Sequence, residues 1–290
     1  MRLVALGSRL EAAGHKPPTL NLTAHSLQPM AAASRFGRYG PMGRQEVRQA
    51  DITGQSYAEQ VKRTREMLRS MDPETVKQVI EVHRDLTVFE ALALAKRERS
   101  IIVPNGIHDR ILTETTDEQY LRQNYPLWTG TLVIYEKPDR PFGEQVVFSW
   151  EHNQVKYSIS FNIPEQFRGK RNGALVVEHP DFDLIALGNN KYELRIDGQN
   201  VHQIDVFPKK DGCYIPHAET GVPHGENAEA NSNTRHLYRL NDSSYMGLLV
   251  RSVDYNGRQV VRASWRASFN WFGVALMPLA AATEKSDLHD

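Results

Sequence analysis

Hydrophobic and polar residues alternate most regularly in residues 155–163, where the apolar side chains are separated by Lys156, Ser158, Ser160 and Asn162. Successive side chains of a strand point to opposite faces, so this two-residue period predicts a strand with one face in a core and one in solvent. Segments of similar pattern flank it on both sides. They are residues 131–135, 146–150, 174–177, 182–187 and 192–196.

Two dipeptides predict hairpin turns between such strands. Asp197-Gly198 and Asn256-Gly257 accept the positive φ angles of a type I′ turn, and the second lies between strand-like residues 247–255 and 258–264. Two-residue turns and half-solvated strands exclude a purely parallel sheet. The alternation continues through residues 261–271, which predicts one long strand that bends near Ala267.

Helical patterns precede the strands. Ser56 with Glu59 and Thr87 with Glu90 have capping-box spacing, so each pair predicts the start of a helix. Asp72-Pro73 ends the first of these helices and begins another. In that middle helix, apolar residues at positions 76, 79 and 80 and then His83 are expected to line one face.

The pattern changes again after Ser100. Residues 101–103 predict a short strand, residues 104–106 predict a turn, and residues 117–125 form a polar segment. We therefore predict a mainly β, α+β fold. A flexible basic arm (1–50) and a small helical unit (51–125) precede an antiparallel β sandwich or barrel (126–277), and a frayed tail (278–290) follows.

Composition narrows the functional classes. Among 290 residues, 35 are Lys or Arg and 35 are Asp or Glu, so the whole chain has no charge bias toward nucleic acid or anionic membranes. A single cysteine, Cys213, excludes an intrachain disulfide or a multi-thiolate zinc site, and fits a reducing compartment. We find no signal peptide and no apolar run near membrane-spanning length. The chain is expected to be cytoplasmic, or part of a particle assembled in the cytoplasm, without membrane contact.

The arm is the one locally basic segment, with seven basic and two acidic side chains in residues 1–50. Arginines alternate there with aromatic residues and glycines, a composition that binds phosphates and stacks on bases. Its alternative roles are a solvated tail or a contact with a neighbouring subunit. Met30 and Met42 are alternatives to Met1 as the true start. The candidate nucleic-acid residues are Arg35, Phe36, Arg38, Tyr39, Arg44 and Arg48.

Histidines and carboxylates gather in the long irregular segment 207–245. Imidazole and carboxylate groups are the ligands of Zn, Fe, Mn or Ni, so this segment is a candidate site for a divalent metal. The alternative is an ordinary surface loop without metal. Cys213 is a candidate nucleophile with His217 or His224 as its base, or otherwise a small hydrophobic residue. The candidate metal ligands are His217, Glu219, His224, Glu226 and His236.

A second acidic cluster, residues 178–183, places three carboxylates and a histidine between two strands. It is either a divalent-cation site with oxygen ligands or an ordinary solvated turn. The chain lacks the Gly-x-Ser-x-Gly elbow, the phosphate-binding Gly-x-x-x-x-Gly-Lys loop and the dinucleotide fingerprint. These absences argue against the commonest enzyme classes.

The pattern as a whole favours a non-catalytic structural or binding module. A long arm ahead of a β domain is typical of subunits that reach their neighbours in a larger assembly, such as a phage-like particle, and exposed strand edges favour pairing between copies. Protein partners or self-association are therefore expected. The alternatives are a metal-dependent enzyme built on the 213–236 segment and a nucleic-acid-binding protein that uses the arm.

Overall fold

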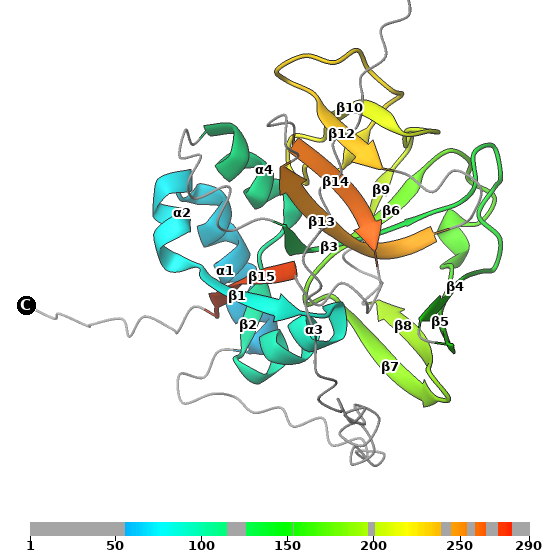
Figure 1. Ribbon diagram of the computed structural model, residues 1–290, viewed down its shortest axis with the longest axis horizontal. Coiled ribbons are helices and arrows are strands. Elements are labelled where there is room, and N and C mark those ends of the chain that lie inside the picture. The colour runs from blue at the N-terminus through cyan, green and yellow to red at the C-terminus, as the bar shows by residue number, and fades with distance from the viewer. Residues whose placement is uncertain are drawn as a thin grey trace, which may run out of the picture. The chain divides into compact units, whose positions relative to one another are not determined.

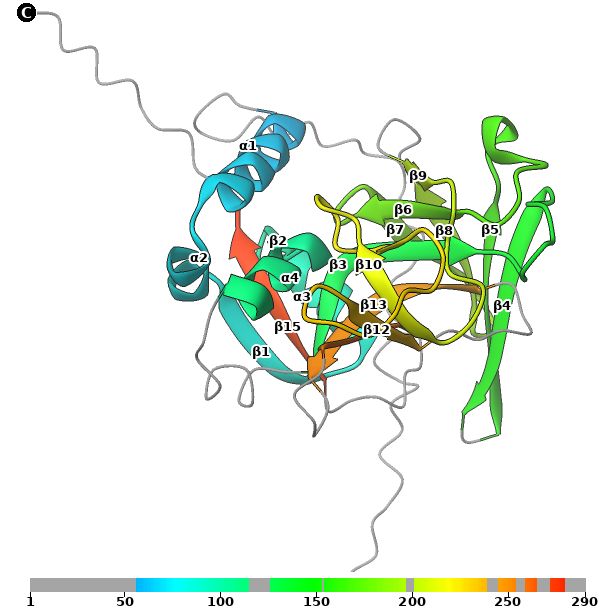
Figure 2. The same ribbon diagram turned by 90° about the horizontal axis from the view of Figure 1, so that it is seen from above.

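Two β-sheets and four α-helices make up the described part of the chain (Figures 1 and 2). The computed structural model describes residues 56–114, 126–152, 154–196, 201–238, 245–253, 259–264 and 272–279. The predicted arm (1–50) and the tail from residue 280 lie outside these residues. The prediction of a mainly β, α+β fold is confirmed, with its helices toward the N-terminal side. Within the described residues, the sheets do not close into a barrel.

The predicted helix starts are confirmed. In α1 (Tyr57–Ser70) the Ser56 hydroxyl accepts the Glu59 N–H, and the Glu59 carboxylate accepts the Ser56 N–H. Asp72 caps α2 (Pro73–Val79), and a second capping box starts α3 (Val88–Arg97). Each cap satisfies N–H groups that have no partner inside the helix.

Two local predictions in the helical segment were wrong. α2 ends at Val79, and the chain continues as strand β1 (Glu81–Leu86) instead of a helical turn through His83. The expected turn at residues 104–106 is the beginning of a fourth helix, α4 (Asn105–Glu114). β1 is a strand because it pairs with β15 (Phe272–Pro278), a partner that lies far away in the sequence.

The larger sheet has eleven strands, eight of them in the order β1-β15-β3-β13-β14-β12-β10-β11. β2 pairs with β15, while β6 pairs with β3 and with β9. Three of these strands lie in the segment predicted to be irregular: β10 (Gly212–Pro216), β11 (Pro223–His224) and β12 (Arg235–Tyr238). The others are β2 (Ser100–Ile102), β3 (Leu127–Tyr135), β6 (Ala174–Glu178), β9 (His202–Ile204), β13 (Tyr245–Val253) and β14 (Gln259–Ser264).

The smaller sheet has the order β4-β5-β8-β7. Its strands are β4 (Gln145–His152), β5 (Val155–Asn162), β7 (Phe182–Gly188) and β8 (Lys191–Ile196). Most pairs in the two sheets are antiparallel, as predicted, but β3–β15, β5–β8 and β12–β14 are parallel, so both sheets are mixed.

The two hairpin predictions have different outcomes. β13 and β14 pair antiparallel on either side of Asn256-Gly257, as expected, although residues 254–258 lie outside the described part. β8 and β9, which flank Asp197-Gly198, pair with other strands instead. The long strand predicted for residues 261–271 is described only as β14, which ends at Ser264; Ala267 falls outside the described residues.

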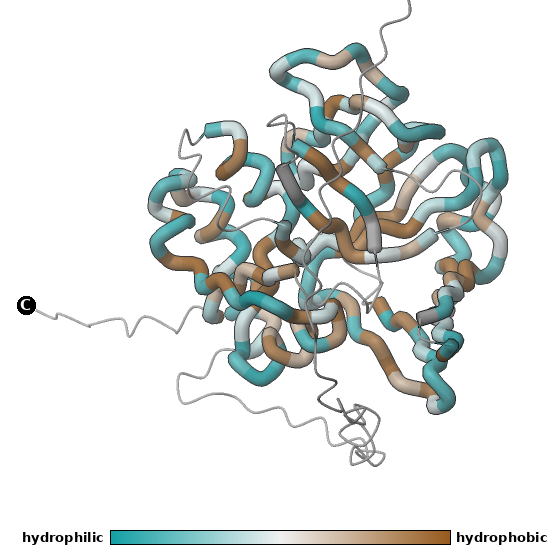
Figure 3. Tube along the Cα trace, in the orientation of Figure 1, coloured by the Kyte–Doolittle hydropathy of each residue, from teal (hydrophilic) through white to brown (hydrophobic). Residues whose placement is uncertain are grey.

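The main hydrophobic core lies between the two sheets. β3 is buried along its whole length, and Trp128 packs edge-on against Phe272 while its ring N–H donates to the Leu86 carbonyl at 3.0 Å. The side chains of β3 reach three hydrophobic clusters: Trp128, Leu132 and Ile134 lie in the main core, Val133 and Tyr135 in a second cluster, and Leu127 in a third. Figure 3 shows the brown, hydrophobic residues concentrated along these central strands and the teal ones on loops and outer helix surfaces. The smaller sheet contributes Val146, Ile159, Phe161, Phe182 and Leu194 to the main core.

Candidate functional site

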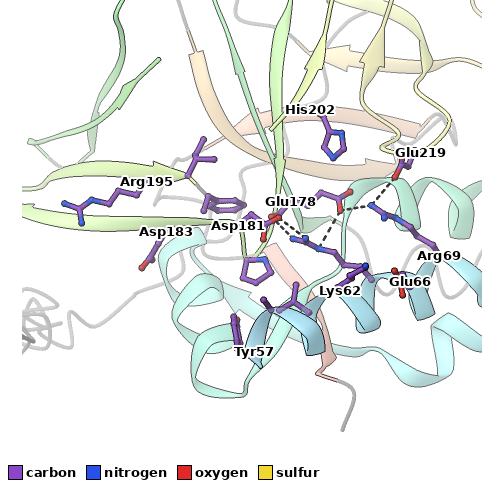
Figure 4. A pocket seen from close by; sticks show the side chains of 16 residues that line it. Tyr57, Lys62, Glu66, Arg69, Glu178, Asp181, Asp183, Arg195, His202 and Glu219 are labelled. Carbon is purple, nitrogen blue, oxygen red and sulfur yellow. Dashed lines mark hydrogen bonds and ion pairs between the residues drawn. The ribbon is translucent and has the colours of Figure 1, made fainter. Parts of the chain in front are cut away.

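A cleft of about 770 Å³ runs along one face of α1. Its opposite wall is built from the end of β6, the turn into β7, the end of β8 and the first residue of β9 (Figure 4). Cavities of a few hundred to a thousand Å³ are the usual size of ligand sites. The polar residues that line it are Tyr57, Lys62, Arg65, Glu66, Arg69, Glu178, Asp181, Asp183, Arg195, His202 and Glu219.

The amphipathic pattern of α1 explains this placement. Val61, Thr64 and Leu68 are buried. The charged residues Lys62 and Glu66 lie at neighbouring positions that line the cleft. Charges on the polar side of an amphipathic helix are ordinarily solvated. Here the fold places the end of β6 opposite them.

Arg65 fixes α1 to the β6–β7 turn. Its Nη1 contacts Asp181 Oδ2 at 2.8 Å, and its Nη2 donates to the carbonyl oxygens of Glu178 and His179 at 2.9 and 2.8 Å. Only a planar guanidinium offers parallel donors in this arrangement. In the acidic segment 178–183, Asp181 and two backbone carbonyls therefore hold an arginine, whereas the Asp183 side chain is 58% exposed. Among the described residues, the segment forms no group that fits a metal ion.

Arg69 lies between two carboxylates. Its Nη2 is 3.2 Å from Glu178 Oε2 and 3.2 Å from Glu219 Oε1 (Figure 4). A pair of carboxylates performing acid–base hydrolysis needs the substrate or a water between them. Here the Arg69 guanidinium occupies that space. The two carboxylates are therefore ion-pair partners of Arg69 and are not arranged as an acid–base pair.

Glu178 is the most enclosed acid of the cleft, with 5% of its surface exposed. Burial raises the pKa of its carboxyl group, and nearby Glu219 adds to this, while the guanidiniums of Arg69 and Arg65 and the His202 ring act in the opposite direction. A buried carboxyl with a raised pKa in a cleft is a common mark of a functional site.

Replacing Arg65 by lysine is expected to lower the free energy of unfolding by about 1 to 3 kcal/mol, because an ammonium group cannot hold Asp181 and both carbonyls together. Urea denaturation followed by circular dichroism measures this. Arg97→Lys is the matched control, because Arg97 is 72% exposed and pairs only with its neighbour Glu98 in the described structure. Equal stability of the two variants would contradict the role given to Arg65.

The predicted metal ligands are only partly brought together. The rings of His217 and His224 lie 5.7 Å apart, but Glu219 forms its ion pair with Arg69. His236 lies on β12, where its ring contacts Tyr238, and Glu226 follows β11. Among the described residues no three His, Cys, Asp or Glu side chains form a group that fits a metal ion.

Of the remaining candidate residues, only Cys213 lies in the described part of the chain. Cys213 lies on β10, in register with His236 on β12, and His224 lies opposite Ile215, two residues further along β10. The candidate nucleic-acid residues of the arm all fall outside the described residues.

A second polar cluster joins α4 to β12 and β13. Asp109 binds Arg235 through both carboxylate oxygens, at 2.8 and 3.2 Å, and also lies 2.9 Å from Arg251 Nη2. Arg251 is fully buried and donates to Asn105 Oδ1 at 3.2 Å. Burial raises the pKa of the neighbouring Tyr214 hydroxyl, which stays protonated. This cluster holds elements together in the interior.

Sequence reasoning missed Arg65, Arg69 and His202 as site residues. Their partners lie more than a hundred residues away for both arginines, so no local spacing indicates the contact. The acidic run 178–183 was the available signal, because a cation site was one of its two interpretations.

Comparison with known proteins gives no family. Neither protein-family models, nor curated proteins, nor solved structures match this chain. Within the described residues, no helix has both the length and the apolar character needed to cross a membrane.

Proposed function

We propose that this protein is a non-catalytic structural module that pairs with a second copy of itself through strand β4, as a subunit of a larger assembly. The support comes from the edge of the smaller sheet, which β4 forms in the described structure. An edge strand presents unpaired N–H and C=O groups that bind another strand.

β4 is long and regular. All eight of its residues pair in unbroken register with β5, from Gln145 opposite Asn162 to His152 opposite Val155. Its only Asp, Glu, Lys or Arg is Glu151, it contains no proline, and Val147 is 51% exposed. Figure 2 shows it next to β5 on the right. Such a strand lacks the lysines, prolines and bulges with which soluble proteins protect their edges.

The opposite edge of the same sheet differs. β7 has an irregular register between Ala186 and Gly188, which limits the length available for pairing. Of the two edges, β4 is therefore the better template for a second chain.

Two β4 strands related by a twofold axis form a self-complementary antiparallel pair. If the axis passes near Phe148, Val146 of one copy opposes Trp150 of the other on the face that already packs against the main core. Apolar and aromatic cross-strand pairs of this kind each contribute about 0.2 to 1 kcal/mol.

The cleft gives no support for catalysis in preference to binding. Arg69 fills the space between Glu178 and Glu219, and the described histidines and carboxylates form no metal-binding group. Assembly through backbone pairing needs neither.

Light scattering coupled to size exclusion tests the proposal on the 33.0 kDa chain. We expect a mass twice that of the chain, reduced to one chain by the double substitution Val147→Lys and Ser149→Lys, because two lysines on an edge strand repel their symmetry mates. Both positions are exposed, so the monomer fold is retained.

Leu187→Lys on β7 is the matched control, because it also adds a lysine at a 58% exposed position, but on the other edge. It should leave the dimer intact. A wild-type chain that stays monomeric at high micromolar concentration, or a doubly substituted chain that stays dimeric, overturns pairing through β4.

A further inference from the structure

The cleft beside α1 carries more acid than base. Its lining contains four Lys or Arg side chains and five Asp or Glu side chains. Three of the four cations already bind carboxylates: Arg65 binds Asp181, Arg69 binds Glu178 and Glu219, and Arg195 binds Glu193 outside the cleft. The negative groups that remain most open to a ligand are Glu66 and Asp183.

One end of the cleft combines an aromatic ring with a carboxylate. Tyr57 is 50% exposed, and Figure 4 shows it with Asp183 at the end away from Glu219. Burial and then Asp181 raise the pKa of the Tyr57 hydroxyl, Arg65 and Arg99 act in the opposite direction, and Asp183 adds a smaller raising effect. A cation over an aromatic face gains about 0.5 to 2 kcal/mol, and a neighbouring carboxylate adds to it.

The only cation in the described structure that pairs with Asp183 is easily displaced. Lys96 Nζ lies 3.6 Å from Asp183 Oδ2, and the two side chains are 79% and 58% exposed. Exposed pairs of this kind contribute less than about 1 kcal/mol. A ligand cation that also contacts Tyr57 is therefore expected to displace Lys96 from Asp183.

The charge distribution along the chain points the same way. Because residues 1–50 hold seven basic and two acidic side chains, residues 51–290 hold 28 basic and 33 acidic ones. The part of the chain that contains the cleft is therefore net acidic and attracts cationic partners.

We propose that this cleft binds a short extended segment of a partner protein that carries an arginine or lysine, with the cationic group stacked on Tyr57 and paired with Asp183. The cleft follows α1 from Tyr57 to Arg69, about 18 Å at 1.5 Å per residue. That length accommodates about five residues of extended peptide. Glu66, which is exposed, and Glu219, whose side chain is 50% exposed, provide acceptors for the rest of the segment.

This site is separate from the proposed pairing of β4, because none of its lining residues belongs to that strand. The two proposals can fail independently. If the protein is monomeric but binds the peptide, the cleft proposal stands and the pairing of β4 is wrong. If the protein is dimeric but does not bind the peptide, only the cleft proposal is wrong.

Fluorescence anisotropy with labelled short peptides tests the proposal on the full chain. The probes are glycine-serine peptides with arginine, lysine or glutamate at the centre. The arginine and lysine peptides should bind at low salt and weaken as salt is added, and the glutamate peptide should not bind. Binding of the glutamate peptide as tightly as the arginine peptide overturns the proposal, as does absence of binding by all three.

Three variants locate the binding. Tyr57→Ala and Asp183→Asn should each weaken the arginine peptide about tenfold, which corresponds to about 1.4 kcal/mol. Tyr57→Phe keeps the aromatic face and should bind like the parent. Glu98→Gln removes the same charge as Asp183→Asn from an exposed position outside the cleft and should also bind like the parent. Equal weakening by Asp183→Asn and Glu98→Gln would assign the binding to net charge and overturn the site.

Discussion

Lowering the pH from about 7 to about 5 is expected to remove about 4 kcal/mol from the free energy of unfolding, because two histidines are buried in the neutral form. His108 is 0% and His179 6% exposed. Burial lowers the pKa of each ring to about 3, and Arg251 acts in the same direction on His108 and Arg65 on His179. The Nδ1 atom of His179 accepts the Ile102 N–H at 3.1 Å, which requires an unprotonated nitrogen.

The direction of the pH effect follows from which state binds more protons. In the unfolded chain both histidines have a pKa near 6.5, whereas in the folded protein the pKa of each is about 3. Between these two pH values, the unfolded state therefore binds more protons than the folded state. Stability therefore falls as the pH drops through this window, by up to about 1.4 kcal/mol per pH unit and histidine. The raised pKa of Glu178 opposes this loss, but only as the pH approaches the titration range of that carboxyl group.

Urea denaturation at the two pH values measures the loss. His179→Asn, whose amide oxygen can accept the Ile102 N–H, should lose about half of the pH dependence. His224→Asn is the control, because His224 is an exposed histidine and should leave the dependence unchanged. If His179→Asn and the parent lose equal stability, the buried neutral ring is not the cause.

Replacing Asp109 by alanine is expected to lower the free energy of unfolding by about 3 to 5 kcal/mol, because it leaves two buried guanidiniums without their carboxylate. Arg235 is 5% exposed and Arg251 0% exposed, and Asp109 is an ion-pair partner of both. Thermal and chemical unfolding followed by circular dichroism measure the change.

Two comparisons separate the buried pair from charge removal in general. Glu114→Ala removes an exposed carboxylate 3.6 Å from Arg110 on the same helix and should cost less than about 0.5 kcal/mol. Replacing Asp109, Arg235 and Arg251 together by apolar residues should recover most of the stability, since an apolar replacement of a buried ionic cluster is often neutral. A loss no larger than that of Glu114→Ala would mean that water reaches the arginines.

Sequence reasoning predicted the elements whose signals are local. The capping boxes at Ser56 and Thr87 work within one helical turn, and the alternation in residues 155–163 follows from the strand itself, so each was confirmed. The failures occurred where a distant partner decides. Glu81–Leu86 continues a helical spacing of apolar residues, but it forms a strand because it pairs with β15. Asn105-Gly106 has the composition of a turn, but it begins a helix whose Ile107 and Ile111 are buried in a hydrophobic cluster.

The candidate site was less predictable than the fold. Arg65 and Arg69 are ordinary surface residues in a helical pattern, and only the tertiary structure brings Glu178 and Glu219 beside them. The histidine-rich segment attracted notice because its residue types are distinctive. Residue type alone does not indicate where a side chain points in the fold. The Glu219 carboxylate pairs with Arg69 of α1 and not with the histidines.

The position of β15 in the larger sheet constrains how the protein is made. β15 lies between β1 and β3, so β1 has no place in the sheet until residues 272–278 have left the ribosome. At synthesis rates of about 5 to 20 residues per second, β1 waits about 10 to 40 s for its partner. During that time the apolar edge of β3 that β15 later covers, and the helices that flank β1, are open to chaperones and to other nascent chains.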